Sequence, residues 1–343
     1  MLRNKSLLES VSFTRVPNVA TIIRQMCRSN GNLKHLAVKF CTNHNEVIPE
    51  DVFRNVLSSC PNLIVLNLKG TNFYTRRFCY ELKLLRHLRS IDLRMNRFLS
   101  VQDVFAIAQS CTNIQELKLS QCNSKFTDQD AVSLFDSLKK TIRSLKLDLR
   151  SLGPPAVLAI FDCTKLTKLY LFCAYSLSGE LFRSLAKQLT NLSHLKICNG
   201  CKLTCEDFCF VFTNYREQLK HLVHVDVSGC WRLEDSGLKA MADTCSVNLQ
   251  YLSVKSCKLI TGAGVEYTIA RCPNILHLNL AHVDKLDELC LNKIPSALPR
   301  LRRLVLDKCS NRYQMLTALR ESILDLEVKE SLCEYSKQER AFL

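Results

Sequence analysis

The sequence is poor in glycine, with nine among 343 residues, and it contains no glycine-rich loop of the kind that binds phosphate. It has neither a GxSxG nucleophile elbow nor an HExxH metal motif, so the sequence gives little support to an enzymatic function. No apolar run reaches the roughly 18 residues that a membrane span needs. The first residues do not resemble a signal peptide. We therefore expect a non-enzymatic protein with no cofactor and no membrane association.

The composition is that of a folded, basic protein. Hydrophobic residues make up 47% and charged residues 23%, a globular balance with ample material for a core. The 47 Lys and Arg exceed the 32 Asp and Glu, which gives a formal net charge of +15. A charge of this size favours acidic partners.

A repeating pattern is clearest at Leu222–Cys245, LVHVDVSGCWRLEDSGLKAMADTC. Leu222, Val225 and Val227 have the spacing Lxx-Lx-L, which indicates a short strand with alternate residues pointing inward. A helix follows, with Asp235 and Ser236 expected to cap it. One half-buried strand and one half-buried helix cannot stand alone, so such units must stack.

The same pattern recurs along the chain at steps of 22 to 30 residues, close to the roughly 20–29 of leucine-rich repeats. It predicts an α/β leucine-rich repeat solenoid, a curved horseshoe with parallel strands on the concave face and helices on the convex face. We expect one elongated domain of about 13 repeats over residues 1–328 and a C-terminal tail over 329–343. The expected strand cores begin at Leu8, Leu33, Leu63, Leu88, Ile114, Ile142, Leu166, Leu192, Leu222, Leu249, Ile275, Leu301 and Ile323, the last continuing through Leu326 and Val328.

The 19 cysteines occupy repeated places, which argues for reduced, structural thiols and hence a cytoplasmic or nuclear protein. One set falls at helix ends and the other just after strands. A local cluster in CNGCKLTCEDFC has some resemblance to metal spacing, although zinc sites usually pair two CxxC-like hooks across a longer gap. We expect no metal site. The helix-end set is Cys60, Cys111, Cys163, Cys245 and Cys272, the post-strand set is Cys41, Cys122, Cys230, Cys257 and Cys309, and the cluster is Cys198, Cys201, Cys205 and Cys209.

The stretch SGCWRLEDSGLKAMADTCSVNLQYLSVKSC, Ser228–Cys257, resembles the cysteine-containing repeats of the F-box and leucine-rich repeat protein family. The resemblance implies a substrate receptor of an SCF-type ubiquitin ligase, in which an F-box binds the ligase adaptor and the cullin assembly. The sequence departs from the family in having no F-box, because Val47–Val56 is better interpreted as a repeat helix. A protein-interaction scaffold or decoy without a ubiquitin role is the alternative.

Strand alternation assigns partner-binding residues to the concave face. A basic series with interspersed rings fits an acidic protein partner, whereas the competing interpretation is an ordinary solvated face. Nucleic acid is less favoured, because no known nucleic-acid motif appears and stacking positions are few. The histidines, one repeat apart and without a nucleophile, are not expected to be catalytic. The candidates are Lys39, Lys69, Arg94, Lys118, Lys146, Lys168, Tyr170, Phe172, His194, Lys196, His224, Tyr251, Lys255 and His277.

Two further expectations concern single places in the chain. Trp231, the only tryptophan, follows Cys230 at a turn, and an exposed anchor and a packed cap are both open interpretations. Asp325 and Glu327 are expected to make the far end of the concave face acidic.

Overall fold

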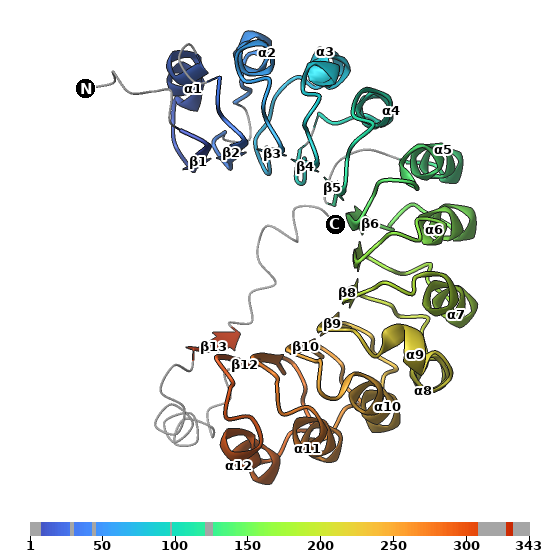
Figure 1. Cartoon of the computed structure of the whole chain (residues 1–343). Coiled ribbons are helices and arrows are strands. Elements are labelled where there is room, and N and C mark those ends of the chain that lie inside the picture. Colours follow the sequence, from blue (N-terminus) through green and yellow to red (C-terminus); the bar gives the residue numbers. More distant parts are fainter. Residues whose placement is uncertain are drawn as a thin grey trace. The chain divides into compact units, whose positions relative to one another are not determined.

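The computed structural model describes residues 8–27, 31–42, 46–96, 98–120, 126–307 and 327–331. The chain divides into two compact units, Met1–Leu166 and Thr167–Leu343. In each unit the strands lie on one face and the helices cover the other (Figure 1). This alternation confirms the predicted α/β leucine-rich repeat solenoid with parallel strands.

Unit 1 contains the first six strands, which pair in chain order and run parallel. Each strand is followed by a helix, as one strand and one helix per repeat require. The strands are β1 (Ser10–Thr14), β2 (His35–Lys39), β3 (Val65–Asn67), β4 (Ser90–Asp92), β5 (Glu116–Lys118) and β6 (Ser144–Asp148). The helices are α1 (Val19–Cys27), α2 (Glu50–Ser59), α3 (Arg76–Glu81) with the 3-10 turn η2 (Leu82–Leu84), α4 (Val101–Ser110), α5 (Asp128–Leu138) and α6 (Pro154–Phe161).

Unit 2 continues the same alternation, again with parallel strands paired in chain order. Its strands are β7 (Lys168–Phe172), β8 (His194–Ile197), β9 (His224–Asp226), β10 (Tyr251–Ser253), β11 (His277–Asn279), β12 (Arg303–Asp307) and β13 (Glu327–Ser331). Its helices are α7 (Gly179–Gln188), α8 (Cys205–Asn214), α9 (Arg216–Leu219), α10 (Asp235–Cys245), α11 (Gly262–Arg271) and α12 (Glu288–Ala297).

The apolar residues of the Lxx-Lx-L pattern form continuous buried layers. In each unit the residue at the middle apolar position of the pattern pairs with its counterpart on the next strand. Every side chain in these two layers is at most 2% exposed. Fully burying one such side chain contributes roughly 1.5–3 kcal/mol, and a neighbouring repeat supplies the covering surface. The layer in unit 1 is Leu36, Leu66, Ile91, Leu117 and Leu145, and that in unit 2 is Leu169, Leu195, Val225, Leu252, Leu278 and Leu304.

The last strand differs from the expected register. The pattern placed Leu326 opposite Leu304, but Val328 pairs with Leu304 and the strand extends to Ser331. Ile323 and Leu326 lie outside the described residues. The register of the strand pairing therefore moves by two residues.

The helix starts show where local prediction worked and where it did not. α4, α5 and α8 begin with capping boxes, in which a Ser or Thr accepts from the third helical residue. The expected cap at α10 is wrong: the N-cap is Glu234, with no side-chain cap bond. Asp235 instead accepts from the backbone N–H and the hydroxyl of Thr261, at 2.8 and 2.6 Å. It thus satisfies the start of the next helix, a contact between repeats that local sequence cannot reveal.

The described cysteines are all free, and the repeated places are buried. A helix-end thiol reaches a carbonyl of the preceding repeat, as from Cys272 Sγ to Ala242 O at 3.6 Å. A post-strand thiol does likewise, as from Cys257 Sγ to Val227 O at 3.2 Å. Thr71 fills the post-strand place in its own repeat and donates to Val38 O at 2.8 Å. The structural role predicted for these thiols is confirmed here; Cys122 and Cys309 lie outside the described residues.

A left-handed residue recurs just after the strands, with φ between 49° and 75°. Only glycine adopts this conformation without strain, and a non-glycine residue there costs roughly 1–2 kcal/mol. At this residue the chain leaves the strand for the turn that leads to the helix. The residues are Arg15, Phe40, Gly70 and Met95 in unit 1, and Cys173, Asn199, Gly229, Ser256 and His282 in unit 2.

Candidate functional site

The candidate residues lie on the strand face, in rows that run across neighbouring strands. A row contains residues that the sheet register places opposite one another. The predicted basic series is not a single row, because its members come from different positions of their strands. In unit 2 the first row, which we call the ring row, is Lys168, His194, His224, Tyr251, His277 and Arg303.

The ring row brings aromatic side chains of consecutive repeats into contact. The rings of His224 and Tyr251 stack with centroids 3.8 Å apart and planes at 10°. His194 stacks on His224 at 5.3 Å and 17°, and Tyr251 meets His277 at 6.0 Å. These rings are half-buried. Such an arrangement presents a flat, pre-organised surface whose side chains have little freedom to lose on binding.

A cation and a buried carboxylate lie beside the ring row. Lys196 Nζ is 2.5 Å from Asp226 Oδ2, and it lies 5.3 Å from the ring centre of Phe172. Asp226 is only 2% exposed and also accepts a hydrogen bond from the Ser228 hydroxyl. Burial alone would lower the pKa of Lys196, but the neighbouring carboxylate of Asp226 raises it above its ordinary value. Lys196 therefore stays charged at neutral pH and is held in place by its bond to Asp226.

Tyr170 joins the ring row to this pair. It is on β7, one alternate position after Lys168, and lies opposite Lys196 in the register. Its ring centre is 6.0 Å from that of His224 and 6.5 Å from that of His194.

Tyr251 and Lys255 are the two candidates contributed by β10 and the turn after it. Burial, followed by the charge of Asp226, raises the pKa of Tyr251, which keeps its hydroxyl protonated. Lys255 lies further along the chain, in the turn after β10, and is exposed.

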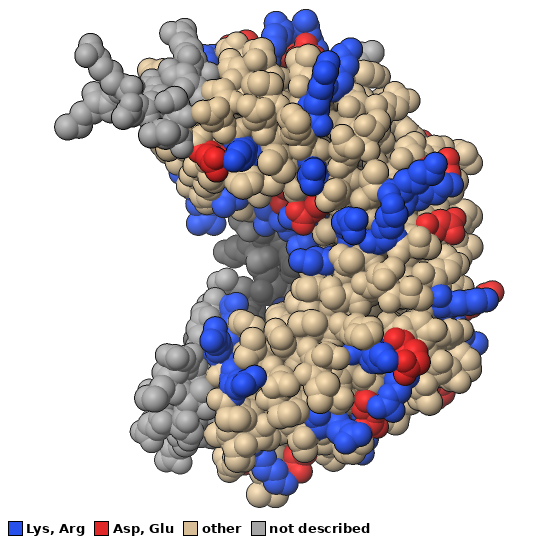
Figure 2. All heavy atoms as spheres, viewed as in Figure 1, with Lys and Arg blue, Asp and Glu red and all other residues tan. Residues whose placement is uncertain are grey.

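The basic candidates of unit 1 also lie on the strand face, in two neighbouring rows. We call Lys39, Lys69, Arg94, Lys118 and Lys146 the basic cluster. All five are half-buried. Lys and Arg atoms are visible along the strand side of this unit in Figure 2. The cluster has no aromatic row comparable with that of unit 2 among the residues described in β1–β6, so the two units offer different chemistry.

Sequence reasoning missed several residues of these surfaces. Asp226 was not considered, although the register aligns it with Lys196. Arg303 extends the ring row beyond His277, and Asp92 and Glu116 lie among the cations of the basic cluster. Aligning the repeats position by position would have found all four. Glu327 lies on β13, and Asp325 is outside the described residues.

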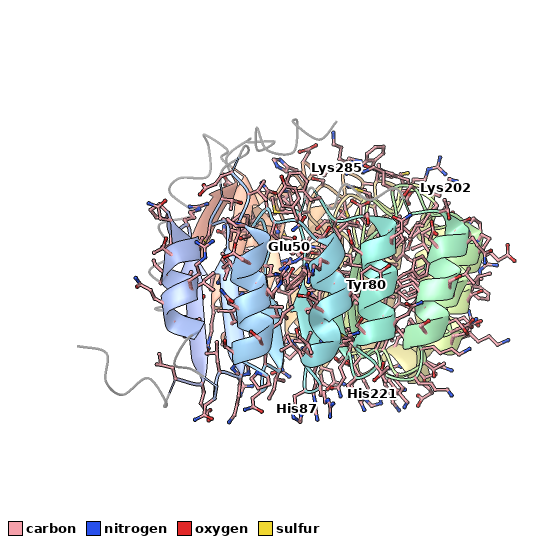
Figure 3. All side chains as sticks on the ribbon, turned by 90° about the horizontal axis from the view of Figure 1, so that it is seen from above. Glu50, Tyr80, His87, Lys202, His221 and Lys285 are labelled. Atoms are coloured by element: carbon pink, nitrogen blue, oxygen red, sulfur yellow. The ribbon has the colours of Figure 1, made fainter. Side chains whose placement is uncertain are left out.

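Trp231 is 57% exposed, so the interpretation as an exposed side chain holds and the packed cap is wrong. It follows β9 at the carboxyl edge of the strands in unit 2, the edge at which Figure 3 labels Lys202 and Lys285. His221 lies at the opposite edge of the same unit. The ring row lies on the strand face between these edges.

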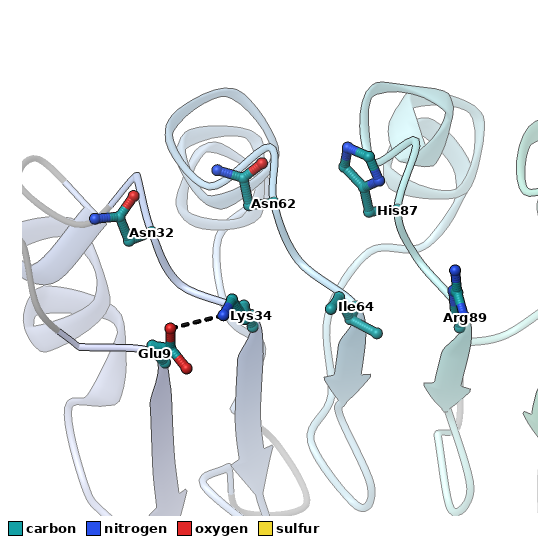
Figure 4. Close-up of a pocket in the computed structure, with 7 residues that line it drawn as sticks. All are labelled: Glu9, Asn32, Lys34, Asn62, Ile64, His87 and Arg89. Carbon is teal, nitrogen blue, oxygen red and sulfur yellow. Dashed lines mark hydrogen bonds and ion pairs between the residues drawn. The ribbon is translucent and has the colours of Figure 1, made fainter.

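Two depressions lie away from the strand-face rows. One, of about 700 Å³, lies in unit 1 beside the segments that lead into the strands, and Lys34, His87 and Arg89 are among the residues that line it (Figure 4). Lys34 forms an ion pair with Glu9 there, at 2.6 Å. The other, of about 420 Å³, lies beside α8 in unit 2 and is lined by Cys205 and Cys209.

The cysteine cluster does not converge on one point. Cys205 Sγ lies 3.0 Å from Ser236 Oγ and accepts from the backbone N–H of Gly237 at 3.3 Å, so it links α8 to α10. Burial raises the pKa of Cys198 to about 12. Among the residues that the structure describes, no group of three or more His, Cys, Asp or Glu side chains is placed to hold a metal ion.

The helices of the described ranges are short. None of them is both long enough and apolar enough to traverse a bilayer.

The fold and the repeat register define a leucine-rich repeat solenoid. A leucine-rich repeat family model matches residues 218–242, the segment around β9 and the start of α10. Among solved structures, the chain is similar to one in the crystal structure of the Rad7 and Elc1 complex from yeast. The identity is 15% and the TM-score 0.59, with 95% of this chain and 89% of that chain covered.

An internalin, inlF, from Listeria monocytogenes is a more distant match. Its identity is 12% and its TM-score 0.44, with 89% of this chain and 82% of that chain covered.

Proposed function

We propose that this chain is the substrate-recognition part of an SCF-type ubiquitin ligase receptor and holds a protein substrate on its strand face. The observation that carries the binding role is the ring row, with His224 and Tyr251 stacked at 3.8 Å. Tyr251 and Arg303 of this row belong to the residue types that dominate binding energy at protein interfaces. The chain acts as a scaffold and performs no catalysis itself.

The ubiquitin role rests on two supports. The cysteine-containing repeats at Ser228–Cys257 resemble those of the F-box and leucine-rich repeat family. The similar yeast structure is that of a complex between Rad7 and Elc1, so a protein of this fold associates with a second protein. On this proposal the SCF adaptor and a cullin join the chain where an F-box is supplied, by a longer form of the protein or by a bridging subunit. Reduced cysteines in the described residues support a cytoplasmic or nuclear location.

A scaffold or decoy that binds a partner without ubiquitin is the second candidate. It is favoured by the described helices and strands, all of which belong to repeats. Both candidates use the same strand face, and they differ in whether the adaptor and cullin are recruited.

Affinity purification of the full chain from cells, followed by mass spectrometry, separates the candidates. We expect the adaptor, a cullin and a substrate to be recovered with the wild type. The variant Tyr251→Ala should lose the substrate at least tenfold while it retains the adaptor and cullin. Tyr80→Ala is the matched control, because Tyr80 is exposed on α3 on the helix side of unit 1 (Figure 3).

The other outcomes are equally informative. If a partner is recovered only when Tyr251 is present, and the adaptor and cullin are not recovered, the scaffold or decoy is the remaining candidate function. Equal recovery of every protein by Tyr251→Ala and the wild type removes the ring row from the binding site.

A further inference from the structure

The basic cluster of unit 1 occupies two neighbouring rows of the strand face. Lys118 and Lys146 are paired in the register of β5 and β6. Lys39 is the last residue of β2, whereas Lys69 and Arg94 lie just beyond the ends of β3 and β4. The backbone bonds Phe40 N to Lys69 O (3.0 Å) and Gly70 N to Arg94 O (2.8 Å) continue the register there. Five cations from five consecutive repeats therefore face the same side.

The carboxylates within the cluster are already engaged. Asp92, 2% exposed, accepts from Arg94 Nη2 at 2.7 Å and from Arg94 Nε at 2.9 Å. Glu116 lies 3.0 Å from Lys118 Nζ. It also accepts from the Ser90 hydroxyl at 2.5 Å and from the Ser144 hydroxyl at 3.2 Å. At the end of β6, Asp148 is 3.6 Å from Arg150. With Asp148 and Arg150 included, three carboxylates lie among six cations, which leaves a surplus of positive charge.

The pKa values of two lysines in the cluster are lowered, first by burial and then by neighbouring cations. Burial, then the charges of Lys118 and Arg94, lower the pKa of Lys146 to about 8. Burial, then the charge of Arg94, lower the pKa of Lys69. Like charges at half-buried positions repel one another, and an arriving anion would relieve that repulsion.

We propose that the basic cluster binds an acidic segment of the partner protein, an extended run of Asp and Glu residues that crosses β2 to β6. Neighbouring strands are ~4.8 Å apart, so a run of acidic residues, not a single one, supplies carboxylates to successive cations. The inference rests on the proposed protein-binding function and names the chemistry of the partner. The acidic segment contacts unit 1, whereas the ring row of unit 2 anchors apolar and aromatic groups.

Binding of such a segment is coupled to proton uptake. At pH 8 Lys146 is about half protonated, because its pKa is about 8. A carboxylate beside it raises that pKa, so binding at pH 8 takes up as much as about half a proton, and at pH 6 almost none.

Isothermal titration calorimetry of the full chain tests this, with a 12-residue peptide of Asp and Glu as the probe. Titrations at pH 8 in buffers of different ionisation enthalpy give the protons taken up. We expect uptake by the wild type and a loss of binding when salt is raised. Lys146→Gln should weaken binding about tenfold and abolish the uptake. Lys83→Gln, an exposed lysine in η2, should change neither.

Three results would overturn the proposal. The first is binding by Lys146→Gln equal to that of the wild type, and the second is binding without proton uptake at pH 8. The third is tighter binding of a 12-nucleotide single-stranded DNA or of a phosphoserine peptide than of the acidic peptide, which would assign the cluster to phosphate. The experiment needs no ligase component. Acidic-peptide binding with no adaptor recovered from cells would refute the ubiquitin role alone, and the converse would refute this inference alone.

Discussion

Lys196 Nζ lies 2.5 Å from Asp226 Oδ2, and the carboxylate is 2% exposed. The two residues come from β8 and β9, so their contact joins consecutive repeats at the strand face. A buried carboxylate without its cation retains a large desolvation cost. This relationship therefore makes Lys196 important for stability.

Replacing Lys196 with Met should lower the free energy of unfolding by about 2 kcal/mol, because it removes a charged hydrogen bond to Asp226. Urea denaturation followed by circular dichroism measures the loss. Lys255→Met, at an exposed lysine of the same face, should change stability by less than about 0.5 kcal/mol. A Lys196→Met variant as stable as wild type would show that the pair contributes nothing net.

The pH dependence of this variant has a defined sign. The pKa of Lys196 is raised in the folded state, so its contribution is complete below the unfolded pKa of about 10.4 and is lost as the pH rises through the folded value. The difference between wild type and Lys196→Met should therefore stay constant from pH 7 to pH 9. A difference that shrinks within that interval would contradict the raised pKa.

Asp235→Ala should destabilise the protein by about 1 kcal/mol, because it removes both bonds to Thr261 at the start of α11. Asp284→Ala, at an exposed aspartate in the turn after β11, is the control. Hydrogen exchange of α11 should also accelerate in Asp235→Ala. If α10 were the only helix affected, the cap within its own repeat would be the correct interpretation after all.

Ser256→Gly should raise stability by about 1 kcal/mol, because Ser256 has a φ of 59° that glycine adopts without strain. Gly229→Ala should do the opposite, since an added Cβ would lie 2.3 Å from Asn199 Oδ1. Urea midpoints of the two variants measured side by side check the signs. Two shifts in the same direction would be inconsistent with backbone strain at this position.

The buried cysteines should resist alkylation in the folded protein. Burial raises the pKa of Cys111, Cys163 and Cys257 to about 12, so at pH 8 only about one thiol in ten thousand is ionised at each. Among the cysteines that the structure describes, half-buried Cys201 should react before these three with iodoacetamide, as read by mass spectrometry of peptides. The same reagent in 6 M guanidinium should label all of them. Rapid native labelling of Cys257 would mean that unit 2 opens readily.

The repeat pattern predicted the strands well because each repeat must bury the same positions. Leu36, Leu66 and Ile91 were identified from spacing alone, and they pair as expected. The pattern holds less information about side chains that contact a neighbouring repeat. Asp235 is an example, since its partner Thr261 is 26 residues away. The shifted register of β13 is another, because nothing in the spacing of Leu326 and Val328 distinguishes one inward residue from the next.

The candidate surface was predicted in composition but not in arrangement. Spacing identified the lysines and rings, and it could not divide them into rows. Whether Lys69 is close to Arg94 or to Lys118 depends on the register that the structure supplies. Asp226 escaped notice because a buried carboxylate beside a lysine looks the same in sequence as an exposed one.

The recurring left-handed residue gives successive repeats the same backbone geometry at the point where the strand ends. Most of the described strands pass to their turns through the same backbone conformation, so the segment from one such residue to the next, as between Gly229 and Ser256, begins and ends in the same way. An additional repeat inserted between two such residues would lengthen unit 2 by one strand and one helix and would need no new backbone geometry. The number of repeats therefore sets the length of the strand face, which changes by one strand for each repeat gained or lost.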